Sequence, residues 1–399
     1  MPAPTSRKAR LWAGLAAALV LTAAFATGQA QTPISLTPET VVAHLGNGPT
    51  LSDGLRMAIL AQRAAPDDLA TATQTARLMI AEGRANGDSR LVGAALSVLQ
   101  PFVASGLPPA QFLAASARQY QHDFPGALAL LDAVITATPN DVNALLNRAT
   151  IHTVIGDYPT ALADCSAIAR LRADVGFLCQ ATTLVLTDTA PQIATRLTAI
   201  LTTPGTLDAS LMPWATSLLG EIALMQGDMA TAETHLRAVL ADDPTAQREQ
   251  LMLADVLLAQ GRADQVSTLL ANAPETDGVL VRRVLAARAM GQDLPDVVAT
   301  LGTRARRSID LGLVAHAREE AMYFLQIADD PAQALERALA NWAQQHEYDD
   351  ARLLIMAADA AGTPAAARPV LDWMDANRIA IPALPLPASV VEISQKPKP

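Results

Sequence analysis

Apolar residues recur at spacings of three and four along most of the chain, between charged and small polar residues. The segment FPGALALLDAVITA (124–137) shows the pattern, with its Leu, Val and Ile positions forming one stripe of a helix. Long runs in which Val, Ile or Tyr alternate strictly, as in strands, do not occur. Ala and Leu supply most of the apolar share, and such side chains let helices pack closely. The pattern predicts an all-α protein made of many amphipathic helices.

Pairs of small or polar residues interrupt this pattern at nearly constant intervals. Successive pairs are 35, 34, 71 and 34 residues apart, and they are Gly87-Asp88, His122-Asp123, Gly156-Asp157, Gly227-Asp228 and Gly261-Arg262. Because 71 is two intervals of 34 plus three, one degenerate repeat is expected within 176–212. A chain of 399 residues with such a period is expected to form a row of repeats and not a single core.

Further positions recur at fixed offsets from the first member of each pair. Small residues lie five positions after it (Ala127, Ala161 and Ala232) and seven positions before it (Ala115, Ala149, Gly220 and Ala254). Prolines lie seventeen positions after it (Pro139 and Pro244). Bulky residues lie two positions after it (Phe124, Tyr158 and Met229). Small residues at these positions let two helices approach closely, and the prolines end the second helix. A 34-residue unit with these positions resembles the tetratricopeptide repeat (TPR), most closely over 108–275.

The resemblance implies a TPR-type α-solenoid, a right-handed superhelix of helix-turn-helix repeats held together by contacts between neighbours. It also implies a concave groove, lined by the first helix of each repeat, that receives an extended peptide or a helix. Projected onto this sequence, the groove candidates are Phe112, Gln119, Tyr120, Asn143, Asn147, Thr150, Trp214, Glu221, Arg248 and Asp255. Each of them could instead be a solvated helix residue or a contact between repeats.

The expected organisation has seven parts. They are a signal peptide (1–30), a flexible leader (31–50), N-terminal helical repeats (51–107), a TPR array (108–280), an irregular helical pair (281–314), C-terminal TPR-like repeats (315–379) and a Pro-rich tail (380–399) that is expected to be extended or disordered.

The first residues have the features of an export signal. Arg7, Lys8 and Arg10 precede an apolar stretch of about 16 residues, which is shorter than the roughly 20 that span a membrane comfortably. Small residues place cleavage after Ala26 or after Ala30. We therefore expect an exported, periplasmic protein without an integral span after signal removal; an uncleaved anchor is the alternative.

The charge of the chain restricts its partners. Removing residues 1–30 takes away three cations and no acid, so the formal charge moves from −10 to −13. An acidic surface repels phosphate backbones, and nucleic acid is therefore not expected as a partner. A protein or peptide partner is expected.

Cys165 and Cys179 are the two cysteines of the chain. If helices flank a turn near 172–175, both sulfurs lie at similar distances from that turn on antiparallel neighbours, and an oxidising compartment favours a disulfide. Two buried free thiols are the alternative. No metal site is expected, because zinc requires about four such ligands.

No motif for catalysis, nucleotide binding or metal binding occurs, so neither an enzyme nor a cofactor is expected. Asp pairs at 242–243, 329–330 and 349–350 are expected to cap helices, and the arginines at 304, 306 and 307 to form a solvated helix face. Trp214, Trp342 and Trp373 could be interface anchors, but core packing is favoured.

The sequence thus predicts a periplasmic scaffold that binds a protein or peptide in its groove. Two alternatives stay open: an enzyme or cofactor protein with a site in 281–314, and a self-assembling structural protein.

Overall fold

The turns that the sequence marks begin and end the helices of the structure. Asp123, Asp157 and Asp228 each accept a hydrogen bond from a backbone N–H in the first turn of the helix that follows. Gly87 ends the preceding helix with a left-handed backbone (φ +66°), a conformation that costs glycine no steric strain. These caps separate the two helices of a hairpin.

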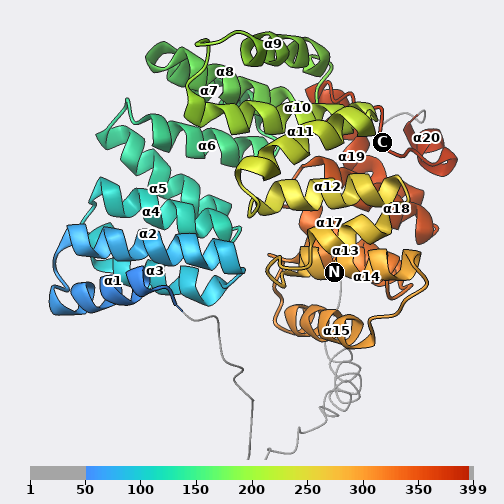
Figure 1. Cartoon of the computed structure of the whole chain (residues 1–399), viewed down its shortest axis with the longest axis horizontal. Helices are drawn as coiled ribbons and strands as arrows, with labels where there is room; N and C mark the ends of the chain where they lie inside the picture. The colour runs from blue at the N-terminus through green and yellow to red at the C-terminus, as the bar shows by residue number, and fades with distance from the viewer. Residues whose placement is uncertain (1–50, 395–399) are drawn as a thin grey trace, which may run out of the picture. The chain divides into compact units, whose positions relative to one another are not determined.

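The computed structural model describes residues 51–394. The expected signal peptide (1–30), the leader (31–50) and the last five residues of the tail lie outside this part of the chain. Within it there are twenty α-helices, two 3₁₀ turns and no β-strand, so the fold is the expected all-α solenoid (Figure 1).

The helices are α1 (Asp53–Ala64), α2 (Leu69–Asn86), α3 (Ser89–Ala104), α4 (Pro108–Tyr120), α5 (Phe124–Ala137), α6 (Val142–Val154), α7 (Tyr158–Leu171), α8 (Ala173–Leu184), α9 (Ala190–Thr202), η1 (Ala209–Leu211), α10 (Met212–Gln226), α11 (Met229–Asp242), α12 (Gln247–Ala259), α13 (Ala263–Leu269), α14 (Asp277–Ala289), α15 (Pro295–Asp310), α16 (Ala317–Gln326), α17 (Pro331–Trp342), α18 (Tyr348–Ala360), η2 (Pro364–Ala367), α19 (Arg368–Asn377) and α20 (Ala388–Ser394).

Small residues hold the hairpins together. The three alanines placed five residues after the turn marks, Ala127, Ala161 and Ala232, are fully buried. Gly220 faces Leu236 of the following helix so closely that a Cβ would come within 3.2 Å of its side chain. Contact between successive helices such as α4 and α5, or α10 and α11, therefore depends on side-chain size at these positions.

The hairpin of α7 and α8 carries the disulfide. Cys165 and Cys179 are joined across it with their Cα atoms 5.4 Å apart. Gly176 lies in the same contact, where a Cβ would fall 2.4 Å from the Cα of Ala169. The two helices meet at backbone distance here, and this brings the two cysteines within bonding range.

Two expected segments look different in the structure. Region 281–314, expected to be short and less regular, belongs to two helices of 13 and 16 residues, α14 and α15. The expectation of an extended or disordered tail is wrong for residues 388–394, which form α20, and Ile381, Leu384 and Val390 are buried. Their aliphatic side chains complete the core beside η2 and α19, which a Pro-rich composition alone does not reveal.

The C-terminal repeats fold back onto the middle of the array. The backbone N–H of His346 donates to the carbonyl oxygen of Val154 over 2.7 Å. Farther along, the N–H groups of Ala380 and Ala383 donate to the carbonyls of Leu186 and Met225 over 2.9 and 3.0 Å. We call these and the neighbouring contacts of residues 345–383 with residues 122–225 the return contacts.

Side chains extend the return contacts. Arg378 forms an ion pair with Asp188, next to an isolated antiparallel bridge between Thr187 and Ile379. One apolar cluster contains buried residues from Tyr158 in the central repeats to Val390 near the end of the described chain. The chain therefore joins distant repeats, in addition to the nearest-neighbour stacking of an open solenoid.

His122 is a titratable member of the return contacts. It occupies a turn position where other repeats have glycine, and its backbone is left-handed (φ +60°). The side-chain amide of Gln345 lies 3.2 Å from its Nδ1 and donates to it when the ring is neutral. Burial, together with the positive charge of Arg318, lowers the pKa of His122 to about 4.

We expect acid to weaken the fold through His122. The unfolded histidine binds a proton below about pH 6.5, whereas the folded one does so only near pH 4, so stability falls as the pH drops from 6.5 to 4. His346, whose pKa burial also lowers, acts in the same direction. The urea midpoint should fall between pH 7 and pH 5, and it should fall less in His122→Asn, whose side chain tolerates the left-handed turn. An equal fall in both proteins would contradict this role.

Candidate functional site

A cavity of about 580 Å³ lies on the inner side of the array, and we call it the tryptophan cavity. Its walls come from α6, α8 and α10, from the start of α12, and from residues 346–348 before and in α18. Trp214 forms part of one wall, half-buried, and its indole N–H donates to the hydroxyl of Thr182 over 3.0 Å. This hydrogen bond fixes the ring plane, so the cavity has a preformed aromatic surface.

Aliphatic side chains and hydroxyls make up most of the tryptophan cavity. The aliphatic residues are Leu146, Val154, Val185, Leu186, Pro213, Leu218, Val239 and Ala246, and the hydroxyls belong to Thr150, Thr153, Tyr158, Thr182, Thr183, Ser217 and Tyr348. The cavity volume is within the range of about 300–1,000 Å³ that is common for ligand sites.

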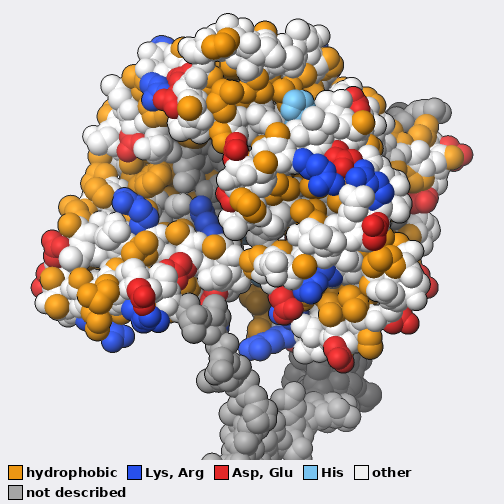
Figure 2. All heavy atoms as spheres, viewed as in Figure 1, with side chains coloured by type: hydrophobic (Ala, Val, Ile, Leu, Met, Phe, Trp, Pro, Cys, Tyr) orange, Lys and Arg blue, Asp and Glu red, His pale blue; other side chains and the backbone are white. Residues whose placement is uncertain are grey.

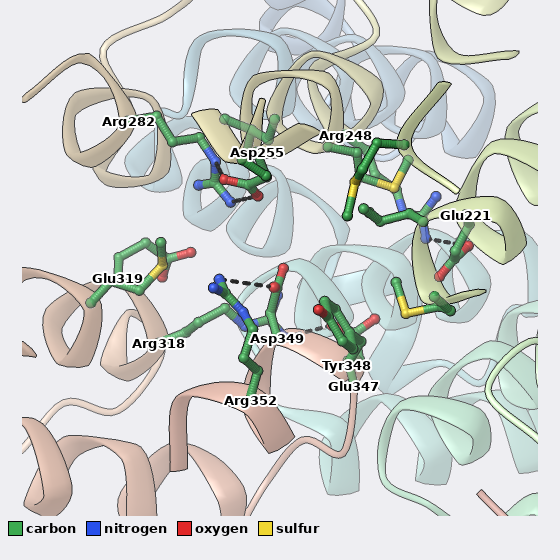
Figure 3. Close-up of a pocket in the computed structure, with 17 residues that line it drawn as sticks. Glu221, Arg248, Asp255, Arg282, Arg318, Glu319, Glu347, Tyr348, Asp349 and Arg352 are labelled. Atoms are coloured by element: carbon green, nitrogen blue, oxygen red, sulfur yellow. Dashed lines mark hydrogen bonds and ion pairs between the residues drawn. The ribbon is translucent and has the colours of Figure 1, made fainter. Parts of the chain in front are cut away.

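A second cavity, of about 230 Å³, adjoins the first, and we call it the arginine cavity. The two share Glu221, Arg248, Glu347 and Tyr348. Its arginines come from four successive first helices: Arg248 from α12, Arg282 from α14, Arg318 from α16 and Arg352 from α18 (Figure 3). They are 34, 36 and 34 residues apart, so the repeat places them along one inner surface.

Acidic partners from adjacent repeats hold the first two arginines. Glu221 of α10 lies 2.7 Å from Arg248, and its charge raises the pKa of that guanidinium. Asp255 of α12 receives two hydrogen bonds from Arg282, at 2.6 and 2.9 Å. A bidentate ion pair of this kind fixes the orientation of the carboxylate and of the guanidinium.

Arg318 is the most heavily bonded of the four arginines. It donates to both oxygens of Asp350, at 2.6 and 2.9 Å, and also to Glu347. The Asp350 side chain is fully buried and further accepts from the amide of Asn341 and the backbone N–H of Glu347. One cation therefore faces two carboxylates, and the cluster ties α16 to the start of α18.

Five of the ten predicted groove residues line these cavities: Thr150, Trp214, Glu221, Arg248 and Asp255. The other five, Phe112, Gln119, Tyr120, Asn143 and Asn147, line neither cavity. Phe112 and Tyr120 pack against apolar clusters of α2–α5, and Arg84 lies over the Tyr120 ring at 5.8 Å. Contact of any of the ten with a partner stays a prediction.

Local sequence patterns did not indicate the residues that the C-terminal repeats bring into the site. The tryptophan cavity is lined by His346, and both cavities are lined by Glu347 and Tyr348. These residues reach the cavities because the chain folds back, which no local pattern indicates. The arginine spacing was a usable signal: counting forward from Arg248 in steps near 34 leads to Arg282, Arg318 and Arg352.

The other candidate residues have structural contacts. Trp342 and Trp373 are buried and pack edge to face, with ring centroids 5.3 Å apart. Asp330 caps α17, and Arg304 pairs with Asp277 at 2.6 Å. Within residues 51–394 no group of three or more acidic, His or Cys side chains is placed to hold a metal ion. No helix in that range has both the length and the apolarity to cross a membrane.

Two family models for the tetratricopeptide repeat match the chain, over residues 112–175 and 223–290. The chain is a TPR protein. The first match contains α6, which lines the tryptophan cavity, and the second contains α12 and α14, which line the arginine cavity. TPR proteins generally mediate protein interactions, and the fold is generally non-catalytic. A comparison with curated protein sequences finds no significant match.

Solved structures of similar fold are distant in sequence. A tetratricopeptide repeat protein from Parabacteroides merdae ATCC 43184 is 12% identical, with 77% of this chain and 99% of that chain covered and a TM-score of 0.37. The Cut9–Hcn1 hetero-tetramer of the APC/C is 11% identical, with 80% of this chain and 68% of that chain covered and a TM-score of 0.40. A human IFIT1 dimer with m7Gppp-AAAA is 12% identical, with 81% of this chain and 85% of that chain covered and a TM-score of 0.39.

Removing Asp350 should loosen the C-terminal half of the site. Asp350→Ala leaves Arg318 with Glu347 alone and deprives Asn341 of its acceptor, and breaking a buried ion pair costs about 3–5 kcal/mol. We expect a lower urea midpoint and faster amide exchange in α16 and α18.

The matched control is Asp264→Ala, at an exposed carboxylate of α13, which should change stability by less than about 0.5 kcal/mol. Equal effects of the two substitutions would show that the Arg318 cluster does not hold these repeats together.

Proposed function

We propose that this TPR protein is a non-catalytic scaffold of the periplasm, and that it binds a segment of a partner protein on its inner surface. The observation that carries the proposal is the pair of adjoining cavities, lined by the first helices of successive repeats and walled by the start of α18. A fixed aromatic side chain, an aliphatic wall and a few polar groups are the usual composition of a preformed binding site.

Export is supported by two features of the chain. The positively charged start, the apolar stretch and the small residues after it have the order of a cleaved signal. The cysteine pair across α7 and α8 suits an oxidising compartment. We propose that the partner is a protein of the cell envelope, reached inside an assembly or maturation system there.

The scaffold role can be tested by site-specific photo-crosslinking in living cells, followed by separation of periplasm and cytosol. A photoreactive phenylalanine analogue at Thr150, in the tryptophan cavity, should give a discrete adduct with a partner protein. The adduct should be found in the periplasmic fraction, on a chain whose first residue is Thr27 or Gln31.

The control position is Thr234, an exposed residue of α11 that lines neither cavity. Adducts from position 234 but not from 150 would show that the partner binds the outer surface. Full-length chain in the cytosol would rule out the proposed compartment.

A further inference from the structure

Each arginine of the two cavities already has a carboxylate partner. Arg282 pairs with Asp255, and Arg352 lies 3.5 Å from Asp349. Arg248 has two acidic neighbours, Glu221 at 2.7 Å and Glu249 at 3.9 Å. An anionic ligand would have to displace these acids before it could reach a guanidinium, so a phosphate or carboxylate ligand is disfavoured.

Negative charge remains after this pairing. The two cavities together are lined by seven carboxylates and four arginines. The carboxylates are Glu221, Asp243, Glu249, Asp255, Glu319, Glu347 and Asp349. His346 adds no compensating charge at neutral pH, because burial lowers its pKa. In a partly enclosed space such an excess is screened less than on an open surface.

Glu319 is the carboxylate best placed to meet a ligand. It belongs to α16 and points into the arginine cavity, near Arg282 and Arg318 (Figure 3). It forms no ion pair with any residue in 51–394, whereas the neighbouring Glu347 shares Arg318 with Asp350. A cation beside Glu319 would give this carboxylate the ion-pair partner that it lacks among the described residues.

Figure 2 shows the charged side chains on one face of the molecule. Acidic and basic side chains are interspersed there, around a hollow between α2–α5 and α12–α15. The excess of carboxylates in the cavity lining agrees in sign with the balance of the whole chain, which has 39 acidic and 29 basic residues.

Methionines make the apolar lining of the arginine cavity adaptable. Met225, Met229, Met252 and Met322 contribute to it, together with Leu224 and Leu251. Thioether side chains change rotamer easily and fit apolar groups of different shape. The lining therefore tolerates several apolar side chains, while the carboxylates select the charge beside them.

We propose that the two cavities bind a peptide segment in which a lysine or arginine lies next to a large apolar residue. The cation is held by Glu319 in the arginine cavity, and the apolar side chain packs against Trp214 in the tryptophan cavity. This assignment rests on the proposed scaffold function and adds the chemistry of the segment that is recognised.

Three short peptides that differ only in charge test the assignment. Each has capped ends and the sequence Leu-X-Leu-X-Leu. The residue X is Lys at both positions in the first peptide, Glu in the second and Gln in the third. Titration calorimetry with the full chain should show the Lys peptide binding about tenfold or more tightly than the Glu peptide, with an affinity that falls as salt is raised. Equal binding of these two peptides, or no binding of the Lys peptide, would overturn the assignment.

A matched pair of variants locates the charge preference. Glu319→Gln should weaken the Lys peptide about fivefold and leave the Gln peptide unchanged. Glu336→Gln, at an exposed glutamate of α17 outside both cavities, should alter neither. Loss of affinity in both variants, or in neither, would also overturn the assignment.

The chain's own tail is the competing occupant. Lys396 and Lys398 are the only lysines after residue 50. If a chain ending at Ser394 binds the Lys peptide more tightly than the full chain, the site belongs to the tail and not to a partner. If the Lys peptide does not bind while position 150 still crosslinks to a partner, the ligand class is wrong and the scaffold function stands.

Discussion

The return contacts determine what kind of binding surface this repeat protein has. A row of helical hairpins by itself offers an open inner surface, because each repeat touches only its neighbours. Here the backbone around His346 bonds to Val154, and residues 380–383 bond to Leu186 and Met225. The inner surface thereby acquires a far wall, and two adjoining cavities form where an open groove was expected.

The ionic cluster of Arg318 supports the same arrangement. A fully buried carboxylate that lost its partner would be costly, so Asp350, Arg318 and Asn341 must keep their geometry as long as the repeats stay folded. That geometry positions the start of α18, and with it Glu347 and Tyr348, in both cavities. Stability and the shape of the site thus depend on the same side chains.

Sequence periodicity predicted the repeats because the residues that shape each hairpin act locally. A glycine or His122 in a left-handed turn, an aspartate cap such as Asp157 and a small residue such as Ala161 each act within one hairpin, so their spacing appears directly in the chain. The return contacts have no such spacing. They join residues that are 158 to 223 positions apart, such as Asp188 and Arg378, and nothing near either residue indicates its partner.

The part of the site that the repeats themselves form could be predicted from the sequence, and the part that the return contacts bring in could not. Trp214, Arg248 and Asp255 were found because the first helix of each repeat faces inward, whereas Glu347 and Tyr348 arrive through the fold-back. For the same reason the Pro-rich tail could not be assigned from composition, since Ile381 and Leu384 are buried in a core that also contains distant repeats.

Amide hydrogen exchange at Ala380 and Ala383 tests the enclosure most directly. Both residues lie outside helices, and their N–H groups donate to carbonyls of the central repeats over 2.9 and 3.0 Å. If the return contacts persist in solution, these two amides exchange as slowly as those in the middle of α10. Exchange at the rate of an unprotected amide would mean that the far wall is not held in place, and the account of an enclosed, charge-selective site would be wrong.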